Sequence, residues 1–191
     1  VAQTLAPGRK PLLVGHSLGG MVAILAGNAY GEQLAGIVVV DWPPQEPELK
    51  DPSPFDLANP QPRIYPDRDS ALARFKVVPK QDVNCAFCLQ HIAQHSIKAE
   101  DGGWRWKFDP AALSQRRKPS FVSDLLAMRC PAALMWGALT ARFDDSVRRL
   151  CREKFTGILP MTEIPNSRHH VMLDEPLALV TALRTQLANW R

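Results

Sequence analysis

A serine bracketed by glycines lies near the start of this 191-residue sequence, in the motif Gly15-His16-Ser17-Leu18-Gly19. The apolar run 12–14 precedes the motif and the small, apolar run 20–30 follows it, which predicts a strand, a tight turn and a helix in that order. Such a turn projects the serine hydroxyl out of a sheet, and the two bracketing glycines are expected to let strand and helix pass closely. We therefore interpret Ser17 as a nucleophile.

The same turn is expected to supply an oxyanion donor. The helix after it begins near Leu18, whose backbone N–H lacks a partner within the helix and can stabilise negative charge that develops beside Ser17. A serine hydroxyl is too weak an acid to attack alone, so it needs a base in hydrogen-bond reach and a third group that orients the base. The rest of the chain must supply both groups.

Strand-like and helix-like segments alternate along the chain, which predicts an α/β fold with a mostly parallel sheet. The β-branched run 36–41 is typical of a strand buried on both faces. The proline-rich stretch 45–66 suits neither a helix nor an interior strand and is predicted to be an extended connector. Further strands are expected at 104–108, 130–137 and 158–164, and further helices at 70–75, 83–98, 143–155 and 174–187.

Composition and charge disfavour several classes of protein. The net charge of +4 comes from dispersed Lys and Arg residues, so we predict no nucleic-acid partner. No apolar run approaches the roughly 20 residues of a membrane span. The four cysteines are too few and too irregularly spaced for a disulfide framework, which favours a reducing compartment, and we predict a cytoplasmic protein.

One spacing has the residue types of a metal site: Cys85 and Cys88 with His91 and His95. Zinc prefers these ligands, but cysteine pairs that bind zinc usually act with a second, distant pair, which the sequence lacks. We interpret the cysteines as buried side chains and the histidines as the polar face of one helix. The sequence therefore predicts neither a metal site nor a cofactor.

The motif around Ser17 resembles the nucleophile turn of the α/β-hydrolase superfamily, in which Gly-His-Ser-Leu-Gly-Gly after a strand is a familiar form. Residues 167–176, SRHHVMLDEP, resemble the terminal pattern of the same superfamily. Residues 101–110, DGGWRWKFDP, resemble the return from the cap to the core in its esterase-like members. The resemblance implies that His169 is the base, and we expect His170 to pack beside it. Arg168 stands where glycine is usual.

The third group, an acid that orients the base, is defined less clearly by the resemblance. Its usual place, three residues after the glycine that ends the penultimate strand, holds Thr140, which cannot carry a negative charge. Asp41 ends the strand after the nucleophile helix, where some cap-bearing relatives have their acid, and we favour it. Asp144 and Asp145 lie along the usual loop and are the alternatives, although Asp144 also suits a helix N-cap. We assign Asp174 to the start of the last helix.

The resemblance also implies a division of the chain into a core and a cap. We predict core residues at 1–44 and 123–191, and a cap or lid insertion at 45–122. The cap would place Trp106 or Phe108 over the serine. Trp42, next to Asp41, is expected to line the acyl pocket.

In this superfamily several strands precede the nucleophile strand, so the chain resembles the C-terminal part of the fold. A second oxyanion donor would then come from a loop that the sequence does not include. Without a neighbour on one side, the strand at 12–14 would be an exposed apolar edge. We expect the isolated chain to fold poorly or to aggregate.

These features predict a serine hydrolase that cleaves small or medium apolar carboxylic esters through Ser17, His169 and Asp41, with a small-molecule substrate as its partner. Thioesters, lactones or C–C bonds next to a carbonyl are alternative substrates, because the cap and loops choose the substrate. A catalytically silent protein of the same fold, binding a ligand or a partner, is the alternative from another class.

Overall fold

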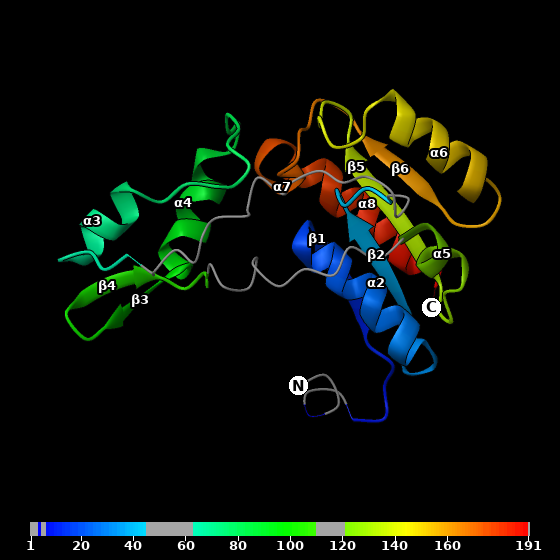
Figure 1. Ribbon diagram of the computed structural model, residues 1–191, viewed down its shortest axis with the longest axis horizontal. Helices are drawn as coiled ribbons and strands as arrows, with labels where there is room; N and C mark the ends of the chain where they lie inside the picture. The colour runs from blue at the N-terminus through cyan, green and yellow to red at the C-terminus, as the bar shows by residue number, and fades with distance from the viewer. Residues whose placement is uncertain (1–3, 5–6, 45–62, 110–120, 191) are drawn as a thin grey trace. The chain divides into compact units, whose positions relative to one another are not determined.

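The computed structural model describes residues 4, 7–44, 63–109 and 121–190. The chain divides into two compact units, Val1–Pro47 with Ser120–Arg191 and Glu48–Pro119 (Figure 1). The first unit contains β1 (Leu12–His16), α2 (Leu18–Tyr30), the 3-10 turn η1 (Gly31–Gln33), β2 (Gly36–Val40), α5 (Phe121–Leu126), β5 (Ala132–Gly137), α6 (Asp145–Phe155), β6 (Met161–Ile164), α7 (Val171–Asp174) and α8 (Pro176–Ala188). The second contains α3 (Arg68–Ala73), α4 (Ala86–His95), β3 (Ile97–Glu100) and β4 (Gly103–Trp106). The assignment of these units to a core and a lid stays a prediction, and most of the predicted connector lies outside the described residues.

A parallel sheet organises the first unit, with the strand order β1-β2-β5-β6. Leu12 of β1 pairs with Gly36 of β2, and Ile37 of β2 pairs with Ala132 of β5. Helices connect these strands, so all four strands end at the same edge of the sheet. The segments that follow β1, β2, β5 and β6 therefore meet there, and the predicted α/β class with a parallel sheet is confirmed.

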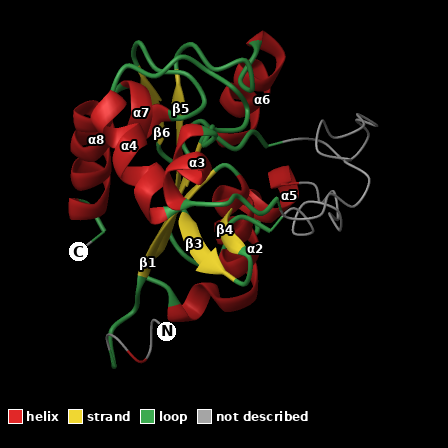
Figure 2. Cartoon of the chain, turned by 90° about the vertical axis from the view of Figure 1, so that its left-hand side faces the viewer, coloured by secondary structure: helices red, strands yellow, loops and turns green. Residues whose placement is uncertain are grey.

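The central strand β2 is buried on both faces, as its run of β-branched residues predicts. Ile37 and Val39 pack into a cluster with side chains of α2, α5 and α6. Val38 and Val40, which point the other way, pack with side chains of α7 and α8. The unit therefore has three layers, and Figure 2 shows α7 and α8 on one side of the sheet and α2, α5 and α6 on the other.

Among the described strands, β1 forms one edge of this sheet. Val14 of β1 is 48% exposed, and Val22 and Leu25 of α2 are 55% and 43% exposed. An apolar edge strand presents unpaired backbone groups together with apolar side chains, which favours pairing with another chain.

We therefore expect the chain to self-associate with increasing concentration, and Val14→Lys to weaken this association because a lysine on an edge strand opposes pairing. Sedimentation velocity over a concentration series measures the effect. Leu177→Lys is the control, since Leu177 is an exposed apolar residue of α8 and not of β1. A wild-type chain that stays monomeric at every concentration would contradict the prediction.

The second unit contains an antiparallel hairpin that the sequence only half predicts. β4 pairs with β3 so that Ile97 lies opposite Trp106, and Gly102 in the turn has φ 85°. The predicted helix 83–98 was too long, because α4 ends at His95 and the next residues belong to β3. The aromatic strand provides a partner that stabilises 97–100 as a strand, which helical periodicity alone does not reveal.

A disulfide in the second unit corrects a further prediction. Cys85 and Cys88, expected as separate buried side chains, are joined by a disulfide at the start of α4, and both are only half-buried. Their i, i+3 spacing at a helix N-terminus brings the two sulfur atoms together. His91 and His95 lie one turn apart on α4, with ring centroids 4.5 Å apart, and both are exposed as expected.

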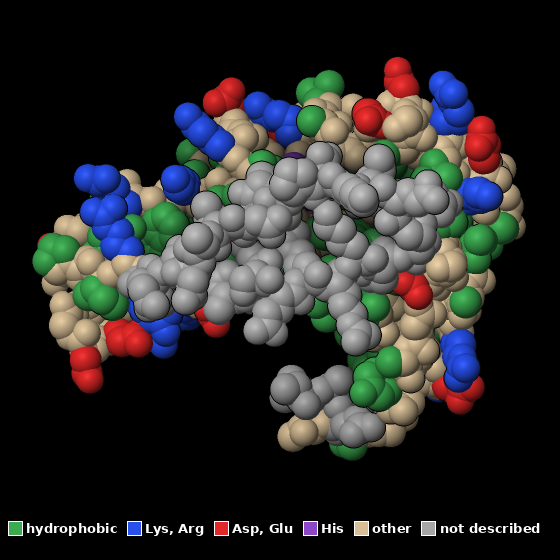
Figure 3. Space-filling view, in the orientation of Figure 1, with side chains coloured by type: hydrophobic (Ala, Val, Ile, Leu, Met, Phe, Trp, Pro, Cys, Tyr) green, Lys and Arg blue, Asp and Glu red, His purple; other side chains and the backbone are tan. Residues whose placement is uncertain are grey.

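Charged side chains of both signs are scattered over the face of the molecule that Figure 3 draws. Figure 3 shows Lys and Arg side chains around the outline of both units, with Asp and Glu side chains near many of them. In the part of the chain that the structure describes, no helix combines the length and the apolar character needed to cross a bilayer.

Candidate active site

The turn between β1 and α2 holds Ser17 in a strained conformation. Ser17 has φ 54° and ψ −122°, which residues other than glycine rarely adopt. Its N–H donates to the carbonyl of Val40 at 2.9 Å, and its carbonyl accepts from the N–H groups of Gly20 and Met21. These bonds join the turn to both β2 and α2, which is how the fold maintains the strain.

The tight passage of strand and helix depends on one bracketing glycine and not on both. A Cβ on Gly15 would lie 2.1 Å from the carbonyl oxygen of Gly19, so no other residue fits there. A Cβ on Gly19 would meet no atom within 4 Å, and the expectation that Gly19 provides clearance was wrong. Gly20 contributes instead, because a Cβ there would lie 3.0 Å from the Cβ of Trp42.

A partly buried ion pair shapes the loop after β6 that carries His169. The Arg168 backbone N–H donates to Oδ2 of Asp174 at 2.8 Å, and the Arg168 guanidinium donates to both oxygens of the same carboxylate. Asp174, assigned from the sequence to the start of the last helix, ends α7 instead and is buried. The arginine that replaces the usual glycine therefore helps to hold the loop.

The structure brings Ser17, His169 and Asp41 together. Oγ of Ser17 lies 3.0 Å from Nε2 of His169, and Nδ1 of His169 lies 2.9 Å from Oδ1 of Asp41. An ionised carboxylate only accepts hydrogen bonds, so Nδ1 donates to Asp41 and Nε2 is left to accept the Ser17 proton. The three residues follow β1, β2 and β6 at one edge of the sheet.

Asp41 is fully buried and accepts three hydrogen bonds. Besides His169, the backbone N–H of Gly137 donates to Oδ2 and the hydroxyl of Thr140 donates to Oδ1, each at 3.0 Å. Its backbone is strained at φ 50°. Thr140, at the position where relatives usually have the acid, therefore binds the carboxylate that comes from the neighbouring strand. From the sequence, Thr140 was recognised only as a residue that cannot be the acid, and this contact was not predicted.

The alternative acids lie elsewhere. Asp144 is the N-cap of α6 and accepts from the N–H of Val147 at 2.9 Å and from the hydroxyl of Ser146 at 2.6 Å. Both hydrogen bonds lower the pKa of Asp144, and the one from Ser146 has the larger effect. Asp145 is exposed in the first turn of α6. Both ring nitrogens of His169 are already engaged, so the structure joins neither residue to it.

Trp42, expected to line the acyl pocket, packs beside the first core cluster. Its ring contacts Phe121 edge-on with centroids 5.8 Å apart, and the Arg142 guanidinium lies 5.9 Å from its centroid. Its buried Nε1 has no acceptor among the described residues.

Trp106 belongs to the small core of the second unit. Its Nε1–H donates to the carbonyl of Ala71 at 3.0 Å, and its ring packs against Tyr65 and Phe75. Phe108 is half exposed. The suggestion that Trp42, Trp106 or Phe108 contacts a substrate stays a prediction.

His16 and His170 both lie against His169. The ring centroid of His169 is 4.8 Å from that of His16 and 4.8 Å from that of His170. Nε2 of His16 donates to the carbonyl of His169 at 2.8 Å. Burial, followed by the charge of nearby His169, lowers the pKa of His16 to about 4. At neutral pH His16 is therefore uncharged.

The lowered pKa of His16 predicts a loss of stability in acid. The unfolded chain binds a proton at His16 near pH 6.5, whereas the folded chain does so only near pH 4. Between these values the unfolded state binds more protons, so the free energy of unfolding falls as the pH falls, by up to about 3 kcal/mol. Urea unfolding at neutral pH and at about pH 4.5 measures this loss.

The matched variant is His16→Gln, because glutamine keeps a donor for the His169 carbonyl but does not titrate. We expect the variant to lose less stability than the wild type over the same pH range. An equal loss in both proteins would mean that another group causes the acid sensitivity.

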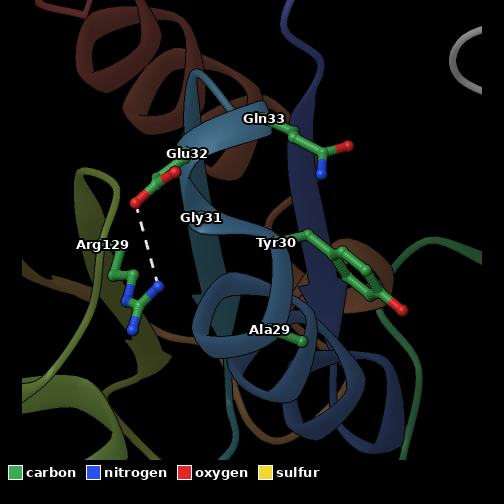
Figure 4. Close-up of a pocket in the computed structure, with 6 residues that line it drawn as sticks. All are labelled: Ala29, Tyr30, Gly31, Glu32, Gln33 and Arg129. Carbon is green, nitrogen blue, oxygen red and sulfur yellow. Dashed lines mark ion pairs between the residues drawn. The ribbon is translucent and has the colours of Figure 1, made fainter.

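A small polar pocket lies at the far end of α2 from Ser17 (Figure 4). It is lined by Ala29, Tyr30, Gly31, Glu32, Gln33 and Arg129. Glu32 and Arg129 point toward one another and form an exposed ion pair at 3.8 Å. The 13 residues of α2 rise about 20 Å at 1.5 Å per residue. The pocket is therefore remote from the candidate active site, and we assign no chemistry to it.

Comparisons with known proteins agree with this architecture. The profile of the alpha/beta hydrolase family matches residues 1–183, so the chain belongs to that family. A search of curated proteins finds no significant match.

Solved structures with the same fold share little sequence with this chain. E-2-(acetamidomethylene)succinate hydrolase superposes with a TM-score of 0.76 at 21% identity, over 97% of this chain and 69% of that one. A thioesterase domain from the curacin biosynthetic pathway superposes with a TM-score of 0.70 at 20% identity, over 95% of this chain and 68% of that one. The esterase Rv0045c from Mycobacterium tuberculosis superposes with a TM-score of 0.69 at 23% identity, over 98% of this chain and 63% of that one. At these identities the likeness establishes the fold alone.

Proposed function

We propose that the protein is a serine hydrolase that cleaves small or medium apolar carboxylic esters, with Ser17 as nucleophile, His169 as base and Asp41 as the acid that orients the base. The observation that carries the proposal is the series of hydrogen bonds from Ser17 Oγ through the His169 ring to Asp41, at 3.0 and 2.9 Å. A strained serine, a buried histidine and a buried carboxylate in this geometry suit nucleophilic acyl transfer.

The reaction would proceed through an acyl-enzyme. Nε2 of His169 takes the proton of Ser17 as its oxygen attacks the ester carbonyl carbon, and the same proton then passes to the departing alkoxide. The N–H of Leu18, at the N-terminus of α2, donates to the oxyanion. Water, deprotonated by His169, then attacks the acyl carbon. The bond to Ser17 Oγ breaks, that oxygen takes the proton back from His169, and the carboxylic acid is released.

The surroundings of His169 favour the transient charge on its ring. Asp41, held by Gly137 and Thr140, stabilises the imidazolium that forms during each proton transfer. His16, whose pKa is lowered to about 4, is uncharged at neutral pH. A positive charge on His16 would repel the imidazolium that forms on His169 and raise the barrier, and a neutral His16 avoids this.

Thioesters are the second candidate substrates. One structural neighbour is a thioesterase domain and another is an esterase, so the fold accommodates both kinds of acyl bond. The same Ser17 and His169 steps cleave either bond, because only the leaving group differs. Comparing kcat/KM for an ester and a thioester with the same acyl chain distinguishes the two candidates.

Labelling with a fluorophosphonate tests the proposed nucleophile directly. The reagent phosphonylates a serine only when a neighbouring base activates it, so we expect one adduct, mapped by peptide mass spectrometry to Ser17. The adduct should be absent after urea unfolding, because the activation depends on His169. Folded protein that stays unlabelled would favour the catalytically silent alternative.

A further inference from the structure

Three of the five histidines meet at the candidate active site. His16, His169 and His170 each offer one ring nitrogen, and these nitrogens all lie within 4.8 Å of one another. No other group of three or more His, Cys, Asp or Glu residues that could hold a metal ion occurs among the described residues. The sequence did not predict this cluster, because His16 is 153 positions from His169.

The hydrogen bonds of two of these rings leave one lone pair available on each. Nδ1 of His169 donates to Asp41, so Nε2 carries a lone pair. Nε2 of His16 donates to the carbonyl of His169, so Nδ1 carries a lone pair. Histidines that bind metals usually donate their second ring nitrogen to a carboxylate or a carbonyl in this way. Both rings are therefore already held in the manner of metal ligands.

We propose that His16, His169 and His170 form an inhibitory site for a divalent transition metal such as Zn²⁺. Imidazole nitrogen is a preferred ligand of Zn²⁺. A tetrahedral ion with bonds of 2.0–2.1 Å needs ligand atoms about 3.4 Å apart, so the three rings approach one another by rotation when the ion binds. A water molecule or the oxygen of Ser17 completes the coordination.

The consequence of binding rests on the proposed function. Nε2 of His169 is the atom that accepts the Ser17 proton, and a metal ion on that atom prevents it from doing so. The hydroxyl then stays protonated and unreactive. The ion inhibits by occupying the base, in contrast to a catalytic metal that activates water.

Protection of Ser17 from a fluorophosphonate measures the inhibition. We expect Zn²⁺ to prevent labelling of the full chain and a chelator to restore it. His170→Asn, which removes one ligand, should raise the Zn²⁺ concentration for half-protection at least about 10-fold. His16→Gln is the second ligand variant, with the same expected direction.

The control is the double variant His91→Asn, His95→Asn, which removes the exposed histidine pair of α4. Histidines one helical turn apart can bind metal weakly, and this variant should be protected at the wild-type Zn²⁺ concentration. Protection that is unchanged in both His170→Asn and His16→Gln, or lost in the α4 variant, would overturn the proposed site.

Cobalt spectroscopy tests the site without any reliance on reactivity. Co²⁺ at three histidines and one oxygen is expected to give the strong visible absorption of tetrahedral coordination, retained in Ser17→Ala and lost in His170→Asn. A tetrahedral spectrum from a protein that no fluorophosphonate labels supports the metal site and contradicts only the hydrolase proposal. A reactive Ser17 with no tetrahedral cobalt spectrum contradicts the metal site and leaves the hydrolase proposal standing.

Discussion

Ser17→Ala is expected to lower kcat for an activated phenyl acetate by about 10⁶-fold, the loss seen when a triad serine is removed from a serine protease. Ser17 Oγ lies 3.0 Å from Nε2 of His169, the ring nitrogen that keeps its lone pair because Nδ1 donates to Asp41. Alanine removes the attacking oxygen but retains the Cβ. The substitution therefore neither relieves nor increases the backbone strain at φ 54°. Steady-state hydrolysis measures kcat, and urea unfolding measures stability, for the wild type and for Ser17→Ala.

The control for this prediction is Ser146→Ala. Ser146 is an exposed serine of α6 whose hydroxyl donates to Asp144, at the N-terminus of the same helix. We expect its kcat to stay within about twofold of the wild type, as for surface substitutions generally. If Ser17→Ala hydrolysed the ester as fast as Ser146→Ala does, the nucleophile would have to be another group.

Asp41→Asn is expected to lower kcat by about 10⁴-fold, the effect of the same exchange in a protease triad. The amide NH₂ would face Nδ1 of His169 and act as a donor, which forces Nδ1 to accept and moves the ring proton to Nε2. A ring protonated at Nε2 cannot take the proton of Ser17. Little change in KM is expected, because the substrate does not contact the buried Asp41.

Asp144→Asn and Asp145→Asn are the matched variants for the acid. Asparagine is also a good N-cap, so Asp144→Asn should retain α6 and change kcat little. Asp145 is exposed and has no contact with His169, so we expect no change in kcat there either. A small effect of Asp41→Asn together with a large effect of Asp145→Asn would transfer the role of the acid to Asp145.

Local sequence was sufficient for the elements that depend on short-range geometry. The turn at Ser17 follows from a strand, a helix and Gly15 between them, where a Cβ would lie only 2.1 Å from the carbonyl oxygen of Gly19. Burial of β2 follows from its continuous β-branched residues. Because these features need only neighbouring residues, the α/β class and the family could be predicted from the chain alone.

Residues that meet through long-range packing were harder to predict. Asp41 and His169 are 128 positions apart. Asp41 was favoured from its place at the end of a strand and from the resemblance, while Asp144 and Asp145 stayed open. The sequence pattern also missed β3, because a short strand with one buried residue is stabilised mainly by its partner β4. Pairing energy of this kind depends on contacts that are absent from any local window.

The sequence by itself determined which strand carries the serine, because backbone strain and strand burial are local properties. The resemblance of residues 167–176 to the terminal pattern of the family indicated the loop that carries His169. Only the tertiary structure decided that Thr140 would donate to Asp41 and that His16 would lie against His169. The physical reason is that parallel strands joined by helices all end at one edge of the sheet. That edge brings together side chains whose separation along the chain, up to 153 positions for His16 and His169, gives no sign of their contact.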